Sequence, residues 1–469
     1  MSSNFLSRCA EFPQRWKECI GAAGGILPLI EYTLVGDVGS ATSVNRIITV
    51  PGFGGIETFG VGTPIFNITD KRNLSPFVVG KDPIDSEYTT IQSALDAAAL
   101  TGSPEVVFVK VGTYTENITI PSNISLVSFK QTILEGTITI TSSVNVLIDS
   151  LTINPSSGMS AINLSGSGLV TLRFLTINTI GATAVTSTNS FLVFLDTSID
   201  VSGTSGSALL ANGSGFQYMG ANCRFTSSNA VDPTIDIADS TDLVVQTATM
   251  ENSAVGSLVF RATGSGMRGL ANSSAGTSGP GALSFSGAPS LCLIAYCDIG
   301  TDLTISITTF FTLKTSTIHS NLTLTAVSAK IISCNDMMNL ILGGAGSYNI
   351  ANCDITETIT VNGTANLILN NSNVNGGGNP TAITYNSSNN NQQINNCEIG
   401  SGAQSTVISL TNTTSELYLT ESLIFGGGGS TGVNGVLGSI LHTNSFNTTR
   451  QVTTAVGAGG IVTMALGFI

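Results

Sequence analysis

The sequence has very few charged residues. Asp, Glu, Lys and Arg together make up 10% of its 469 residues, against roughly 25% in typical soluble proteins. Only 16 residues are Lys or Arg, and the formal net charge is −13. Because nucleic-acid binding depends on clusters of Lys and Arg that neutralise phosphates, this composition argues against a nucleic acid as partner.

Histidines and long apolar runs are also scarce. The two histidines and the lack of a Cys-x-x-Cys pair mean that no metal site of the zinc type is predicted. No run of about 18 apolar residues is present, so no membrane-spanning helix is predicted. Residues 1–21 carry charges where a secretory signal peptide needs its apolar region, and we expect no such signal.

Cysteine is present but not in the pattern of a disulfide framework. Most of the eight cysteines fall inside predicted strands, at intervals that follow the repeat described below. We therefore expect small buried core residues with free thiols. The eight are Cys9, Cys19, Cys223, Cys292, Cys297, Cys334, Cys353 and Cys397.

The residues that are abundant point to a β-solenoid. Hydrophobic residues make up 42% of the chain, in short β-rich segments, and Gly occurs 52 times. Thr, Ser and Asn fill most polar positions in place of Lys and Glu. A polar but uncharged surface of this kind is typical of solenoids and fibres, and the hydrophobic content argues against disorder.

One amphipathic helix precedes the strands. Ile91, Ala94, Leu95 and Ala98 recur at helical spacing, so we predict a short helix at about residues 90–99 with one apolar face. Short β-branched segments follow it at close intervals. A helix in this place would cap the open end of a strand stack, which otherwise exposes unpaired backbone and apolar interior.

These residues carry a resemblance to a known family. The run TIQSALDAA (90–98), the run VFVKVGTYTENITI (107–120) and the strand ISL (124–126) resemble the entry of the pectate-lyase-like superfamily. That superfamily contains pectate lyases, pectin methylesterases, polygalacturonases and many viral tailspikes and fibres. The resemblance implies an all-β fold, a right-handed single-stranded parallel β-helix. Its fold signature falls on Ile91, Gly112, Tyr114 and Glu116, and the resemblance implies that the Gly-x-Tyr-x-Glu element formed by the last three occurs in members with and without catalysis.

A repeat of 18 to 26 residues extends to the end of the chain and predicts about 13–14 coils. Met250 and Ile299 are 49 residues apart, a gap that fits two coils with the middle one hidden in 267–276. In AYCDI, ANCDI and NNCEI the Cys and Ile share the inward face, because side chains alternate along a strand. Asp298, Asp354 and Glu398 then share the outward face.

Three segments are predicted. Residues 1–80 contain a helical start at Ser7–Cys19 and short strands at 32–35, 46–50 and 64–68, and form an attachment or assembly segment or, alternatively, a plain N-terminal cap. Residues 81–446 form the β-helix, and the apolar residues 447–469 form an end strand or assembly segment.

Catalytic signatures of the superfamily's pectinases are missing from the sequence, which favours a role without catalysis. The best remaining carboxylates are Asp232, Asp236 and Asp239, followed by Asp242. They suit a glycosidase pair or Ca²⁺ ligands, or alternatively a solvated turn. The outward column Asp298, Asp354 and Glu398 is either a binding surface or a solvated face. Five tyrosines either stack on sugars or pack at corners: Tyr218, Tyr296, Tyr348, Tyr385 and Tyr418.

From these features we expect a structural or host-recognition component of a virus or phage particle, such as a fibre, spike or surface protein. It would form a homotrimer, contact other particle proteins through residues 1–80, bind a host glycan and lie on the virion surface. One alternative is a glycoside hydrolase or polysaccharide lyase of the same fold, and another is a cell-surface adhesin. Fold alone does not separate them.

Overall fold

The computed structural model describes most of the chain from Phe77 onward. Described are residues 46–48, 56–59, 65–67, 77–443, 453–456 and 461–464, with gaps at 84–85, 142–144, 167, 255–256, 278–281, 326–327, 390, 401–404, 425–430 and 437–438. The predicted helix Ser7–Cys19 and the strand at 32–35 lie outside these residues. An antiparallel sheet is formed by β1 (Arg46–Ile48), β2 (Ile56–Phe59) and β3 (Ile65–Asn67). β1 and β3 fall inside predicted strands, whereas β2 was not predicted.

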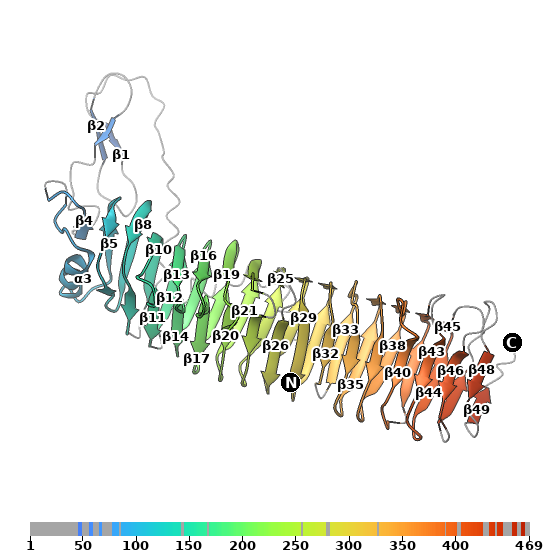
Figure 1. The fold of residues 1–469 in the computed structure, drawn as a ribbon. Coiled ribbons are helices and arrows are strands. Elements are labelled where there is room, and N and C mark those ends of the chain that lie inside the picture. Colours follow the sequence, from blue (N-terminus) through green and yellow to red (C-terminus); the bar gives the residue numbers. More distant parts are fainter. Residues whose placement is uncertain are drawn as a thin grey trace.

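From β4 (Phe77–Val79) onward the strands stack as parallel coils, as Figure 1 shows. One coil consists of β12 (Leu169–Arg173), β13 (Thr176–Ile180) and β14 (Val185–Thr188). The next consists of β15 (Phe191–Leu195), β16 (Ser198–Ser202) and β17 (Leu209–Asn212). Each strand pairs in parallel with its counterpart one coil later. The predicted fold class, a parallel β-helix, is confirmed.

One of the sheets shows how far the stack extends. It holds 16 strands, from β7 (Ile118–Thr119) to β48 (Thr453–Val456). Thirteen of them, from β11 (Ile162–Ser165) to β46 (Thr431–Gly435), fall in the stretch for which the repeat predicted coils. β48 pairs with β46 in parallel, so strand pairing continues beyond residue 446.

At the other end, β4 (Phe77–Val79) pairs in parallel with β5 (Glu105–Val109), so pairing begins before the predicted boundary at residue 81. Between these strands lies α3 (Ile91–Ala99), which crosses the end of the rod in Figure 1. Thr90 is its N-cap, and Thr90 Oγ1 accepts a hydrogen bond from the Ser93 N–H. The four residues expected on its apolar face are all buried: Ile91, Ala94, Leu95 and Ala98. The capping helix is confirmed.

The interior is built from columns of apolar side chains, one per coil. The residues that the repeat placed inward lie in register, as in the pairs Ile177 with Ile199 and Val374 with Ile399. Ala275 pairs with both Met250 and Ile299, so it belongs to the hidden coil that the 49-residue gap predicted. The small methyl group of Ala275 explains why this coil was hard to see in the sequence.

The six cysteines in the described part of the chain are buried and free, as predicted. They are Cys223, Cys292, Cys297, Cys334, Cys353 and Cys397, whereas Cys9 and Cys19 lie outside that part. Burial raises the pKa of Cys292 to about 12 and that of Cys223, Cys297 and Cys397 to about 11. These thiols therefore act as small apolar core groups.

Candidate functional site

A sharp corner of the coil recurs at the same place along most of the rod. At this corner one non-glycine residue per coil has a positive φ, between 45° and 60°. At most of these corners the backbone N–H donates to a carbonyl of the following coil, for example Asn352 to Asn370 O at 3.1 Å and Asn396 to Thr420 O at 2.9 Å. The corner residues are Ser150, Phe174, Asp196, Asn222, Thr247, Asn272, Tyr296, Thr315, Ser333, Asn352, Asn371, Asn396 and Glu421.

The residue after each corner residue points inward and fixes the turn. Many of these inward residues are Ser or Cys. Where Ser follows Cys one coil later, the Ser hydroxyl accepts the Cys backbone N–H, as in Cys353 N–H to Ser372 Oγ and Cys397 N–H to Ser422 Oγ, both 3.1 Å. The Ser372 hydroxyl in turn donates to Asn370 O at 2.8 Å. These contacts hold successive corners in line, because they join the polar groups of one turn to those of the next.

The next residue points outward and opens a short strand. Such strands include β28 (Asp298–Ile299), β36 (Asp354–Ile355), β39 (Asn373–Val374) and β42 (Glu398–Ile399). Asp354 pairs with Asn373, and Asn373 with Glu398, so the two carboxylates are two coils apart on one face. Asp298 lies further along the same outward column, through Thr317 and Asn335. The structure thus brings the three predicted carboxylates onto one face.

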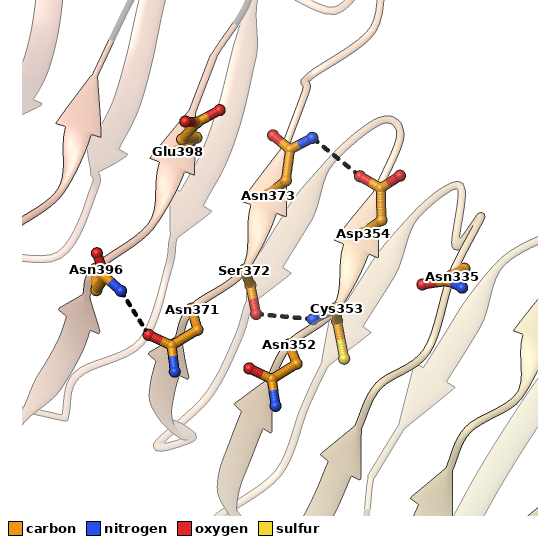
Figure 2. A pocket seen from close by; sticks show the side chains of 9 residues that line it. All are labelled: Asn335, Asn352, Cys353, Asp354, Asn371, Ser372, Asn373, Asn396 and Glu398. Atoms are coloured by element: carbon orange, nitrogen blue, oxygen red, sulfur yellow. Dashed lines mark hydrogen bonds between the residues drawn. The ribbon is translucent and has the colours of Figure 1, made fainter.

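A shallow groove of about 460 Å³ runs along this corner. We call it the Glu398 groove; its lining residues are Asn335, Asn352, Cys353, Asp354, Asn371, Ser372, Asn373, Asn396 and Glu398. Figure 2 shows Asp354, Asn373 and Glu398 projecting from three neighbouring short strands. The Asn373 amide donates to Asp354 Oδ1 at 3.1 Å, and the Asn396 amide to Asn371 Oδ1 at 2.7 Å. The lining is therefore a partly ordered array of amides and carboxylates.

A second groove, of about 400 Å³, lies on the same corner nearer the N-terminus. We call it the Tyr296 groove; it is lined by Thr247, Ala248, Thr249, Asn272, Ser273, Ser274, Tyr296 and Asp298. Its aromatic residue, Tyr296, is 53% exposed at a corner position with φ 56°. Of the other predicted tyrosines, Tyr348 and Tyr385 are buried, whereas Tyr418 is 37% exposed.

His319 lies between the two grooves. Its Nε2 is 3.0 Å from Asp298 Oδ1, and its Nδ1 is 3.9 Å from Asp336 Oδ2. All three side chains are more than half exposed, so these contacts are surface interactions of modest strength. Among the residues that the structure describes, no three His, Cys, Asp or Glu side chains are grouped so that they could hold a metal ion.

The carboxylates of the Asp232 cluster tie neighbouring coils together. Asp236 forms a two-point ion pair with Arg261 of the next coil, with N···O distances of 2.9 and 2.6 Å. These hydrogen bonds raise the pKa of the Arg261 guanidinium. Asp232 Oδ2 accepts the Gly206 N–H at 2.8 Å, and Asp239 Oδ2 accepts the Gly213 N–H at 3.1 Å. Each of these three carboxylates thus binds a group of a neighbouring coil. Calcium binding by this cluster stays a prediction.

The fold-signature residues lie at the end of the rod that α3 caps, and in the sequence they are far from the residues that line the two grooves. Tyr114 is buried; its hydroxyl donates to Lys110 O at 3.0 Å, and Lys81 Nζ lies 4.4 Å from its ring centroid. A Cβ at Gly112 would lie 3.5 Å from Tyr114 Cε2, an ordinary contact. These residues hold the first coils against α3.

In the described residues, no helix is long and apolar enough to cross a membrane.

Comparisons with known proteins give no family assignment. No protein-family model matches the sequence, and no curated protein matches it. Similar solved structures include the tailspike protein gp49 from Acinetobacter baumannii bacteriophage Fri1, a capsular polysaccharide depolymerase. Its identity is 10% and its TM-score 0.28, and the match covers 88% of this chain and 69% of that one.

Two further matches have similar values. The A-module of the mannuronan C-5 epimerase AlgE4 from Azotobacter vinelandii is 14% identical, with a TM-score of 0.26, over 80% of this chain and 94% of that one. The Streptococcus pneumoniae surface protein and adhesin PfbA is 14% identical, with a TM-score of 0.25, over 80% of this chain and 91% of that one. At such values none of the three transfers a residue role to this chain.

Sequence reasoning missed the corner residues that build the grooves. Asn352, Asn371 and Asn396 each stand one position before the inward Cys or Ser of the motifs ANCDI, NNSNV and NNCEI. Asn is the non-glycine residue best suited to a positive φ, so the recurring Asn was a readable signal for the turn. The groove itself was not readable, because it depends on how three coils align.

Proposed function

We propose that this chain is a structural and recognition component of a virus or phage particle, a fibre or spike in which copies of the β-helix pack side by side. One copy would present to the host surface the corner of its coils that carries both grooves. The observation that supports the proposal is a strip of apolar side chains at outward positions of four successive coils, in which Phe191 is exposed and the others are partly buried.

The apolar outer patch consists of outward residues from four neighbouring strands: β12, β15, β18 (Phe216–Met219) and β21 (Asp242–Gln246). Phe191 is 38% exposed, and its ring stacks on Phe216 with centroids 4.5 Å apart. The patch residues are Leu169, Phe191, Val193, Leu195, Phe216, Tyr218 and Val244. Outward positions of a solvent-facing sheet are normally polar, so this patch favours a protein contact.

A second copy of the chain is the partner that best fits the patch. The patch runs along the rod because its residues stack coil upon coil. Copies related by a rotation axis parallel to the rod therefore present the same strip of residues to one another. Closed rotational symmetry of this kind is the usual arrangement of homo-oligomers, and three copies are the number expected from the sequence.

The native mass in solution tests this proposal. We expect a trimer mass for the full chain by light scattering, and a monomer mass for Phe191→Glu, because the new carboxylate would be buried unpaired at the contact. Phe310→Glu is the matched control, since Phe310 is 50% exposed but lies outside the patch; it should keep the trimer. A monomeric wild-type chain would refute the proposed assembly.

A second candidate function is hydrolysis of a polysaccharide. It is favoured by Asp354 and Glu398, which lie two coils apart in one groove with Asn373 between them. Inverting glycosidases use two carboxyl groups about 6.5–9.5 Å apart, and two coil steps place the strands of these residues about 9.4–9.8 Å apart, at the upper end of that range. Release of reducing ends from a panel of polysaccharides, abolished by Asp354→Asn and by Glu398→Gln, would support this candidate. A lack of products would exclude it for that panel.

A further inference from the structure

We propose that the Tyr296 groove and the Glu398 groove are two parts of one binding surface for a linear, uncharged polysaccharide that lies along the rod. This inference rests on the recognition role in the proposed function and specifies its ligand. Native mass and glycan binding are measured separately, so a failure of one is distinguishable from a failure of the other.

The two grooves belong to one continuous corner. Thr249, Ser274 and Asp298 of the first groove are in register on successive coils, and so are Asp354, Asn373 and Glu398 of the second. Pairing from Asp298 through Thr317 to Asn335, and the hydrogen bond from Asp354 N–H to Cys334 O, join the two runs. From Thr249 to Glu398 there are eight coils, and the seven steps between them, at about 4.8 Å each, span about 34 Å. A surface of this length suits an extended chain better than a small molecule.

Tyr296 gives the surface an aromatic platform that the fold itself does not require. A bulky side chain at positive φ is unfavourable, and the equivalent position is Asn in coils such as those of Asn272 and Asn352. Phe174, the other aromatic corner residue, has the Arg173 guanidinium 5.5 Å from its ring centroid. The Tyr296 ring instead faces solvent and lines a groove. Sugar C–H faces pack against such rings, as aromatic residues do in many ligand sites.

The remaining lining offers both donors and acceptors at the coil spacing. Asn371 and Asn373 already hold hydrogen bonds to neighbours in the lining, which fix their amides in place (Figure 2). Each amide keeps further donor and acceptor capacity. Hydroxyl groups of a sugar both donate and accept, so a row of ordered amides matches a row of sugar units without any requirement for charge on the ligand.

The charge of the surface selects against acidic polysaccharides. Neither groove has a Lys or Arg among its lining residues, whereas Asp298, Asp354 and Glu398 contribute carboxylates. A polymer of uronic acids would place like charges against these groups with no Lys or Arg in the lining to compensate them, which is unfavourable. Neutral hexose or N-acetylhexosamine polymers avoid this cost.

An array of immobilised linear polysaccharides, some neutral and some rich in uronic acid, tests the inference with the full-length protein. We expect retention on neutral polymers and little on acidic ones. Tyr296→Asn should weaken binding to the retained polymer about tenfold, a reasonable loss for one aromatic platform. The same variant should keep or raise the melting temperature, since Asn suits the corner better than Tyr.

Tyr418→Asn is the matched control. Tyr418 is also an exposed tyrosine, 37% accessible, but it stacks on His442 at 4.4 Å outside both grooves. Binding by this variant should equal that of the wild-type protein. The inference is overturned if no neutral polymer is retained, if acidic polymers are preferred, or if Tyr296→Asn binds as tightly as wild type while remaining folded.

Discussion

The carboxylate of Glu116 accepts the backbone N–H of Ile91 at 2.8 Å and, through its other oxygen, that of Gln92 at 3.1 Å. Both donors belong to the first turn of α3, where backbone N–H groups have no partner within the helix. Glu116 therefore docks the capping helix on the strand stack. The same glutamate ends the Gly-x-Tyr-x-Glu element by which the sequence resembled the β-helix superfamily, so the structure gives that residue a physical role.

Replacing Glu116 should loosen this end of the rod. Glu116→Ala removes the acceptor of two N–H groups and should destabilise the cap by about 1–2 kcal/mol, the range for loss of a helix N-cap. Glu116→Gln keeps one acceptor oxygen and should cost less. Hydrogen exchange of the α3 amides is the measurement, with faster exchange expected at Ile91 and Gln92.

Glu87→Gln serves as the control for this prediction, because Glu87 is an exposed carboxylate just before the same helix. Its exchange pattern should match the wild type. Equal protection of α3 in Glu116→Ala and in wild type would show that packing of the buried face alone holds the helix.

The ion pair between Asp236 and Arg261 leads to a second prediction. Asp236→Asn should lower stability by about 1 kcal/mol, since the pair is bidentate but Arg261 is partly exposed. The double variant with Arg261→Gln should lose less than the sum of the single losses, because either change alone breaks the pair. Thermal unfolding measures both. Retention on polysaccharides should stay unchanged, and a large drop there would instead assign Asp236 to ligand binding.

Most of the fold could be predicted from the sequence, because the apolar repeat marks each coil. Each coil places one large apolar residue in the same inward column, so Ile177, Ile199 and their counterparts mark the period directly. The weak coil at Ala275 was detectable only as a gap, since a methyl group gives little periodic signal. Local chemistry also sufficed for α3, whose apolar spacing and N-cap Thr90 are both visible in the sequence.

Less of the candidate site could be predicted from the sequence. Outward carboxylates such as Asp354 and Glu398 were predicted to share a face, but their shared groove depends on the register of β36, β39 and β42. The spacing of the Asp232 cluster suited either a site or a solvated turn, whereas the structure joins its members to backbone N–H groups and to Arg261. Sequence spacing does not show which partner a carboxylate finds one coil away.

The positive φ of the corner predicts that glycine destabilises the protein less than alanine does when either replaces a corner asparagine. Asn222 has φ 58°, and its amide donates to Asp196 Oδ1 at 2.8 Å. Asn222→Ala should lose both the hydrogen bond and about 1–2 kcal/mol of backbone preference, whereas Asn222→Gly loses only the hydrogen bond. We therefore expect melting temperatures in the order wild type, Gly, Ala. Asn222 lies outside both grooves, so stability is read without an effect on binding. An Ala variant as stable as the Gly variant would contradict this account of the corner.

The buried thiols predict a loss of stability at alkaline pH. Burial raises the pKa of Cys297 and Cys397 to about 11, whereas an unfolded cysteine titrates near 8.5. A raised folded-state pKa contributes stability that is present below the unfolded value and is lost as pH rises toward 11. Each thiol should cost about 1.4 kcal/mol per pH unit in this window.

The double variant Cys297→Ser, Cys397→Ser isolates this effect. Serine suits both positions, because the equivalent residue one coil later is Ser316 or Ser422, and each hydroxyl accepts the cysteine backbone N–H at 3.1 Å. Melting temperatures measured from pH 7 to pH 10 should fall less steeply for this variant than for the wild type. The two proteins differ only at these two positions, so the difference between their curves reports on the two thiols. Parallel curves would show that these thiols ionise as readily in the folded as in the unfolded protein, and would contradict their role as apolar core groups.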